Sequence, residues 1–101
     1  MYAVIFRATI AEFDEEYFRV AEKLKELAFK EYGCRDFVSV TEGNEEIAIS
    51  YWDSMQHIRA WKNDVQHRRA QAMGRDKRYK KFSVEICEVV KPVKTQTIPI
   101  N

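Results

Sequence analysis

The sequence predicts an α+β domain in which four strands and two helical regions follow in the order β-α-β-β-α-β. Three observations predict it: strand-like apolar runs near both ends of the domain, two long segments with helical apolar spacing, and the tight-turn pair Gly43-Asn44 between two further strand-like runs. In this order the two helical regions pack on one face of a four-stranded antiparallel sheet. The predicted arrangement is therefore the split βαβ, or ferredoxin-like, fold.

Length and composition are those of one small globular domain. The chain has 101 residues, of which 46% are hydrophobic and 13% aromatic, so it can build a core that a partner subunit would help to complete. We assign residues 1–90 to the domain and residues 91–101 to a C-terminal tail. No apolar run reaches the length of a membrane span, and the N-terminus lacks the pattern of a signal peptide.

Cysteine usage predicts neither a disulfide framework nor a metal site. Cys34 and Cys87 are far apart and belong to no CxxC or Cys/His motif, so we expect no metal. Two isolated cysteines in a chain without a signal fit a reducing cytoplasm, where they act as small apolar core residues. We therefore expect a cytoplasmic protein without a metal cofactor.

The first strand covers residues 2–10, YAVIFRATI, and its near-continuous apolar character is typical of a central strand. Arg7 is its only charge, and a salt bridge or an anionic ligand would satisfy it. A helix follows over residues 14–31, with acids in its first turn and an apolar stripe made of Tyr17, Val20, Ala21, Leu24, Leu27 and Ala28. Gly33 ends this helix, and core packing accounts for it without any chemistry.

A hairpin and a second helical region come next. Residues 37–42 and 46–52 form the two strands, and Asp53-Ser54-Met55-Gln56 has the pattern of a capping box in which Asp53 caps the helix. The segment 62–64 interrupts the helical pattern, so we expect two helical pieces, the second capped by Asp64 and ending near Tyr79. Residues 82–90 alternate as the last strand.

Charge and apolar surface both indicate association. Residues 12–46 are mainly acidic and residues 59–81 mainly basic, a division that suits subunit pairing, an anionic ligand, or two solvated helix faces. Two helices cover only one face of the sheet, while the strands are apolar on both. We therefore expect the open face to pack on a second copy, and the tail to lie along that partner.

The segment 45–75, EEIAISYWDSMQHIRAWKNDVQHRRAQAMGR, resembles the signature of the antibiotic biosynthesis monooxygenase family. In that signature a strand ends in an aromatic residue and Trp, Asp-Ser or Glu-Ser follows, and a helix carries Trp and then His or Gln. The resemblance covers residues 1 to about 90. It implies a dimeric α+β barrel with a pocket between sheet and helices. It also implies activities from oxygenation of polycyclic phenols without metal or flavin to haem degradation.

The resemblance implies a set of site residues. Cofactor-free relatives use a Trp on the second helical region with a polar residue one turn earlier, positions held here by Trp61 and His57. An imidazole can accept a phenol proton at neutral pH, so these two form the implied catalytic pair. The implied substrate-binding residues are Arg7 as an anion or phenolate anchor, Trp61 as a wall, His67 and Gln71 as polar groups, and Tyr79 and Phe82 at the pocket mouth.

Haem-degrading relatives place a haem-ligating His ten residues after the Trp and an Asn on the first strand. This chain has Gln71 at the position of the His, and Arg7 lies near the position of the Asn. Glutamine is a poor iron ligand, and His67, one turn earlier, would serve only after a shift of the helix. We therefore expect no cofactor, and the haem-degrading activity ranks behind the others.

Three function classes remain. A cofactor-independent monooxygenase that acts on a small aromatic or quinol-type compound fits the implied site. A non-catalytic dimeric protein that binds small molecules, for instance in stress, fits the same residues. An RNA-binding module of this fold needs a basic and glycine-rich third strand, which residues 46–52 lack, so we expect no nucleic acid partner.

Overall fold

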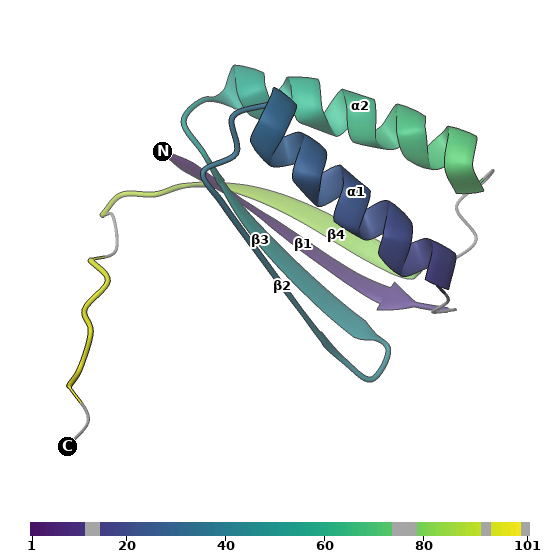
Figure 1. Ribbon diagram of the computed structural model, residues 1–101, viewed down its shortest axis with the longest axis horizontal. Helices are drawn as coiled ribbons and strands as arrows, with labels where there is room; N and C mark the ends of the chain where they lie inside the picture. The colour runs from purple at the N-terminus through teal and green to yellow at the C-terminus, as the bar shows by residue number, and fades with distance from the viewer. Residues whose placement is uncertain (12–14, 74–78, 92–93, 100–101) are drawn as a thin grey trace.

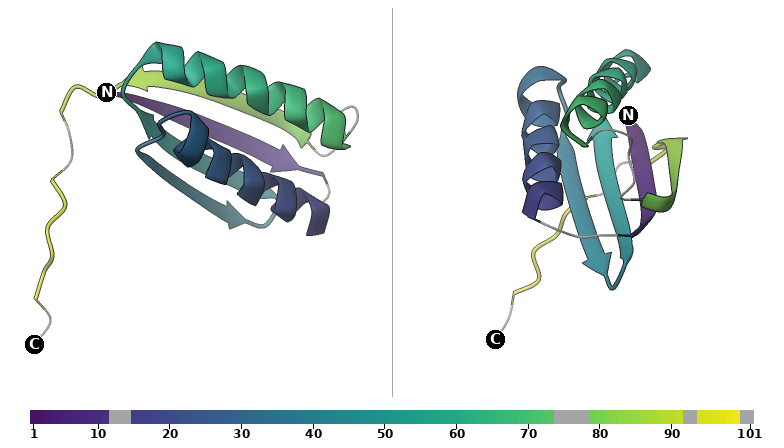
Figure 2. Two further views of the ribbon diagram at one scale, coloured as in Figure 1. Left: turned by 45° about the horizontal axis from the view of Figure 1, so that its top comes forward. Right: turned by 90° about the vertical axis from the view of Figure 1, so that its right-hand side faces the viewer.

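The computed structural model describes residues 1–11, 15–73, 79–91 and 94–99, with the backbone alone over 66–73. The elements follow in the order β1 (Tyr2–Ile10), α1 (Glu15–Glu31), β2 (Asp36–Glu42), β3 (Glu45–Trp52), α2 (Met55–Met73) and β4 (Tyr79–Glu88). The four strands form one antiparallel sheet in the order β2-β3-β1-β4, and both helices lie on the same face of it (Figures 1 and 2). The predicted ferredoxin-like α+β fold is confirmed.

Strand register assigns every sheet residue to one of two faces. Val4 is paired with Ser50 and Ile86, and Phe6 with Ala48 and Val84, so these side chains share the face under the helices. Their neighbours in the sequence point the other way, because side chains alternate along a strand. The opposite face therefore carries the apolar residues Ile5, Val38, Val40, Ile47, Ile49 and Tyr51. In the single chain this face is open (Figure 2).

The buried residues form two separate clusters under the helices. One surrounds Trp52, which is fully buried, and includes Ile58 and Ala28 where α1 ends and α2 begins. The other joins Ile10 and Tyr17 near the start of α1. Predicted stripe residues Tyr17, Leu24 and Ala28 are buried, and Gly33 follows α1 with φ of 72° as expected. The predicted helix start at position 14 lies outside the described residues.

Two expectations about α2 were wrong. Its first turn is capped by Ser54, whose Oγ accepts the backbone N–H of His57 at 3.2 Å, whereas Asp53 lies 3.7 Å from Arg35 in an exposed ion pair. The helix also runs unbroken from Met55 to Met73. Asp64 does not cap a second piece, because its carboxylate accepts the hydroxyl of Tyr32 at 2.6 Å.

Strand β4 begins earlier than predicted, and an irregularity near its start changes which side chains face the helices. Thr9 is paired with Lys81, but Ile10 is paired with Tyr79, so one residue is skipped in a β-bulge. A bulge shifts the alternation by one position. Tyr79 and Phe82, three residues apart, therefore both face the helix side, whereas regular alternation would place them on opposite faces.

The tail leaves the body of the molecule. Residues 94–99 are exposed, contain no helix or strand, and extend away from the sheet (Figure 1). Val90 and Ile98 are 94% and 80% exposed in the single chain. Neither described helix combines the length and apolar character that crossing a bilayer requires.

Candidate functional site

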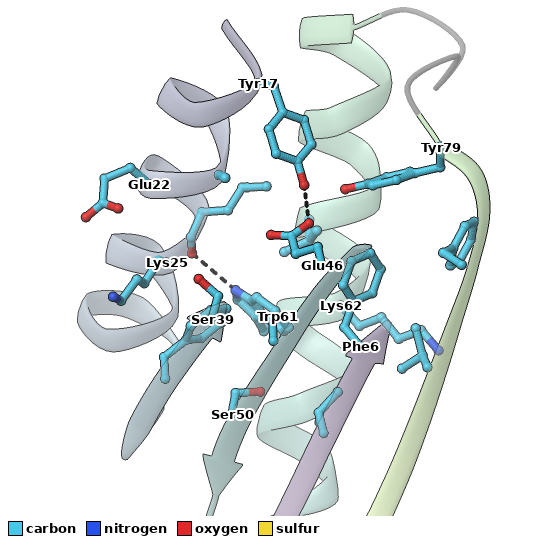
Figure 3. A pocket seen from close by; sticks show the side chains of 18 of the residues that line it. Phe6, Tyr17, Glu22, Lys25, Ser39, Glu46, Ser50, Trp61, Lys62 and Tyr79 are labelled. Carbon is cyan, nitrogen blue, oxygen red and sulfur yellow. Dashed lines mark hydrogen bonds between the residues drawn. The ribbon is translucent and has the colours of Figure 1, made fainter. Parts of the chain in front are cut away.

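A cavity of about 820 Å³ lies between the sheet and the helices. All four strands and both helices contribute to its lining, which is mainly apolar (Figure 3). Apolar cavities with a few polar groups are the usual form of small-molecule sites. Residues of both buried clusters, among them Val4, Ile58 and Tyr17, contribute to its lining.

Indole and phenyl rings build one wall of the cavity. Trp61 of α2 packs on Trp52 with ring centroids 5.1 Å apart and meets the edge of Phe37 at 6.1 Å. Its Nε1 donates to the carbonyl oxygen of Leu24 on α1 at 3.4 Å. Trp52 in turn donates to Ser50 Oγ at 2.8 Å, so the buried indole under Trp61 is hydrogen-bonded. These contacts fix Trp61 as a rigid face of the cavity.

A polar group lies at the opposite end, where β3 begins. Glu46 points to the cavity, and its Oε2 accepts a hydrogen bond from the hydroxyl of Tyr17 on α1 (Figure 3). The ring of Tyr79 lies 6.3 Å from that of Tyr17. Burial, and next the hydrogen bond to Glu46, raise the pKa of the Tyr17 phenol far above its ordinary value, so this phenol remains a donor at neutral pH.

The bulge in β4 adds an aromatic group beside this polar end. Tyr79 meets Phe6 edge-on at 5.7 Å, and Phe82 stacks on Phe6 at 6.1 Å. Phe82 is nevertheless 63% exposed, so it lies where the cavity meets solvent. Tyr79 and Phe82 both line the cavity, and their predicted role at its mouth stays a prediction.

The structure brings together only part of the predicted site. Trp61, Tyr79 and Phe82 line the cavity. His57 is exposed at the start of α2, where its ring lies over Gly33 and its Nδ1 is 2.6 Å from Ser54 Oγ. It is absent from the cavity lining, because the helix stripe that faces the sheet runs through Ile58, Trp61, Lys62 and Val65.

Arg7, His67 and Gln71 are not among the described residues that line the cavity. Arg7 is exposed on the face of the sheet that points away from the helices, so it does not line the cavity. His67 and Gln71 fall within α2, but their side chains lie outside the described residues.

The structure also shows two cavity residues that our sequence analysis missed. Tyr17 was assigned to core packing alone, yet its hydroxyl reaches the cavity carboxylate. Glu46 was read only as the start of a strand. The alternation Glu46, Ala48, Ser50, Trp52 contained the signal, since a buried Trp at one position places the others on the same face.

The described residues do not fit a metal ion or haem. They contain no group of three or more His, Cys, Asp or Glu side chains that could hold a metal. The cavity lining, within the side chains that the structure describes, includes neither histidine, cysteine nor methionine, and the hydroxyl of Tyr17, one of its two tyrosines, donates to Glu46. We therefore derive no chemistry through either group.

Known proteins resemble this chain in sequence and in architecture. The protein YqjZ of Bacillus subtilis, which is uncharacterised, is 36% identical over 89 residues, or 87% of this chain and 78% of that protein. A variant of SnoaB, a cofactor-independent oxygenase of Streptomyces nogalater, superimposes with a TM-score of 0.73 at 11% identity and covers 93% of this chain and 97% of its own. Rv0793 of Mycobacterium tuberculosis gives a TM-score of 0.73 at 16% identity, with 92% and 98% covered.

These likenesses in structure agree on the fold, and the sequence comparison goes further. The model of the antibiotic biosynthesis monooxygenase family matches residues 1–73, which hold β1, α1, β2, β3 and α2. This chain belongs to the antibiotic biosynthesis monooxygenase family.

Proposed function

We propose that this protein is a monooxygenase that oxidises a small aromatic or quinol-type compound with dioxygen and uses neither metal nor flavin. The observation that carries the proposal is the cavity of about 820 Å³, whose lining is mostly aromatic and aliphatic with a smaller number of polar groups. Such a lining suits a planar apolar ligand with a hydroxyl group. Family membership supports the reaction class, and the similarity to SnoaB supports independence from cofactors.

The residues proposed to contact the substrate are Trp61, Tyr79 and Phe82, which all line the cavity. Trp61 would provide a flat wall, since its ring is held by Trp52 and Leu24. His57 and Arg7 do not line the cavity, so the implied catalytic base and anion anchor have no support from the geometry. His67 and Gln71 stay predictions.

We also propose that the protein works as a homodimer in which the open face of each sheet packs on the other. Val38 and Val40 are 51% and 61% exposed there, and the adjacent strand adds Ile47. Exposed β-branched residues on neighbouring strands form a flat apolar surface that a second copy of the same face would bury. The tail with Val90 and Ile98 would lie along the partner.

The proposed reaction is tested by incubating the protein aerobically, with a chelator and no added flavin, with phenols, quinols and naphthols. We expect oxygen consumption, and incorporation of an atom of isotopically labelled dioxygen into a phenol or naphthol product. Ligands that bind the cavity should also raise the melting temperature by mass action. Ligand binding without oxygen consumption would instead indicate a small-molecule-binding protein.

A cavity-filling pair of variants provides the control. Ala21 lines the cavity from α1, whereas Ala60 is exposed on α2. Ala21→Phe should abolish both the thermal shift and the oxidation, because the added ring occupies the ligand volume. Ala60→Phe should leave both unchanged, and equal behaviour of the two variants would refute the cavity as the site.

A further inference from the structure

The cavity contains a carboxylate that the implied catalytic set does not include. Glu46 lies on the cavity face of β3, two residues before Ala48, and accepts the hydroxyl of Tyr17. In Figure 3 the hydroxyl of Tyr79 also points toward this pair from the β4 side. A carboxylate and two phenols from three different elements therefore lie together at one end of a mainly apolar cavity.

A carboxylate that faces an apolar cavity loses much of its hydration, so it needs hydrogen-bond donors. Tyr17 supplies one donor to Oε2. An ionised carboxylate offers about four acceptor sites on its two oxygens and donates none, so it can accept another hydrogen bond from a ligand. Its preferred ligand group is a neutral hydroxyl, while a ligand carboxylate would meet like charge and an ether would have no hydrogen to donate.

We propose that Glu46 binds the hydroxyl group of a neutral phenol or naphthol in the cavity and takes its proton during oxidation, with Tyr17 as the residue that positions the carboxylate. This inference rests on the proposed monooxygenase function. It assigns the base to the polar end of the cavity rather than to His57, whose exposed ring lies outside the lining.

The step balances with dioxygen as the oxidant. One electron passes from the aromatic ring to dioxygen while the hydroxyl proton passes to Glu46, which leaves a phenoxyl radical and superoxide. These two combine, a C–O bond forms para to the original oxygen, and Glu46 returns the proton to the resulting peroxide. Cleavage of the O–O bond with loss of the ring C–H proton releases water and a quinone, so a phenol and dioxygen give a quinone and water.

The proton transfer suits a carboxylate because the ring loses an electron in the same step. A neutral phenol is a much weaker acid than a carboxylic acid, with a pKa of about 10. A phenol that has lost an electron is a strong acid, so transfer to a carboxylate becomes favourable.

Other charged groups line the cavity but do not face the carboxylate. Glu22 and Lys25 come from α1 and Lys62 from α2, and in Figure 3 their charged ends point away from Glu46. Among the described side chains, the titratable groups that face Glu46 are Tyr17 and Tyr79.

The recognition is tested by calorimetric titration with three probes that share one ring system: α-naphthol, α-methoxynaphthalene and α-naphthoate. Wild type should bind α-naphthol at least tenfold more tightly than the other two. Glu46→Gln should reduce the preference for α-naphthol over α-naphthoate by about tenfold or more and leave α-methoxynaphthalene unchanged. The matched control is Glu45→Gln, because Glu45 is the preceding residue, lies on the opposite face and is exposed.

The proton transfer is tested by the rate of α-naphthol oxidation to the naphthoquinone. Glu46→Gln should lower kcat by about a hundredfold, the usual scale for a lost general base. Tyr17→Phe should lower kcat by less than Glu46→Gln does and leave KM near the wild-type value, as a positioning role requires. Glu45→Gln should retain the wild-type rate.

The outcomes separate this inference from the proposed function. If wild type oxidises α-naphthol and Glu46→Gln does so equally fast, the function stands and the role of Glu46 is wrong. If wild type binds α-naphthol without oxidising it, the proposed function and the proton transfer are both wrong. Whether Glu46 binds the hydroxyl group is then decided by the relative affinities for the three probes. If none of the probes binds to wild type, both proposals are overturned.

Discussion

The phenol of Tyr17 makes the folded state sensitive to alkaline pH. Burial and the hydrogen bond to Glu46 raise its pKa above the value of about 10 that tyrosine has in an unfolded chain. The folded state therefore holds this proton more tightly than the unfolded state. The stabilisation is complete below about pH 10 and is lost progressively as the pH rises above it.

Tyr17→Phe should accordingly reduce the free energy of unfolding at neutral pH by about 1–3 kcal/mol, because Glu46 loses its donor. The difference between wild type and variant should shrink as the pH rises beyond about 10. Urea unfolding across that range measures both effects. A difference that stays constant with pH would contradict the buried position of the phenol.

The two tryptophans should differ in their access to solvent. Trp52 is fully buried, whereas Trp61 is partly exposed at the cavity wall. Trp61→Phe should leave emission at short wavelength that acrylamide scarcely quenches, at a cost on the order of 1–2 kcal/mol in stability. Wild type should show an additional quenchable component that a cavity ligand protects. Strong quenching of the variant would mean that Trp52 is accessible.

Periodicity reaches its limit at the residue scale. It placed Trp61 on the inner face of α2. It also grouped His57 with Trp61, although residues four positions apart lie on the same face of a helix only approximately. Orientation at the helix start depends on the local cap, and the Ser54 hydroxyl holds the His57 backbone there. Glu46 was missed because an acid at a strand start is most often solvated, and its partner Tyr17 lies 29 residues away in sequence.

At the scale of elements, the segment 53–56 allows two interpretations, in which either Asp53 or Ser54 caps the start of α2. Ser54→Ala should cost about 1 kcal/mol, because the amide of His57 loses its acceptor. Asp53→Ala should reduce the free energy of unfolding by less, about 0.5 kcal/mol at most, since its ion pair with Arg35 is exposed. Thermal unfolding of both variants measures this, and Ser54→Asp should restore stability. The opposite ranking would support Asp53 as the cap.

Most elements were predictable because each contains its own pattern. β1 was predicted with the observed bounds, and the Gly43-Asn44 turn and Gly33 lie where expected. The unbroken course of α2 was not predictable from its own residues, because the carboxylate of Asp64 accepts the hydroxyl of Tyr32 from another part of the chain. The bulge before Lys81 was also not predictable, since the register of β4 depends on its pairing with β1.

At the scale of the whole molecule, the open sheet face predicts association. Wild type should sediment with a mass near twice 12.0 kDa at micromolar concentration. Val40→Lys combined with Ile47→Lys should yield monomers, because these paired residues are exposed on the open face and a buried unpaired ammonium is costly. Phe29→Lys, on an exposed position of α1, is the control and should leave the mass unchanged. A wild-type monomer would remove the basis for the dimer.

The tail makes a separate prediction. A chain that ends at Lys91 should keep the fold, since residues 94–99 lie away from the sheet (Figure 1). It should nevertheless dissociate at higher concentration than the full chain if Ile98 is covered by the partner. Equal dissociation constants would show that the tail does not take part in assembly.

The alternation of β3 has a consequence for how this protein can change. Its even-numbered residues, Glu46 to Trp52, face the helices and the cavity beneath them, and its odd-numbered residues, Ile47 to Tyr51, face the open side. Substitutions can therefore alter the proposed ligand choice and the proposed subunit pairing independently, one position at a time. Insertion or loss of a single residue in β3 would exchange the two sets and damage both together. Variation within this strand should thus consist of replacements, with changes in length confined to its ends.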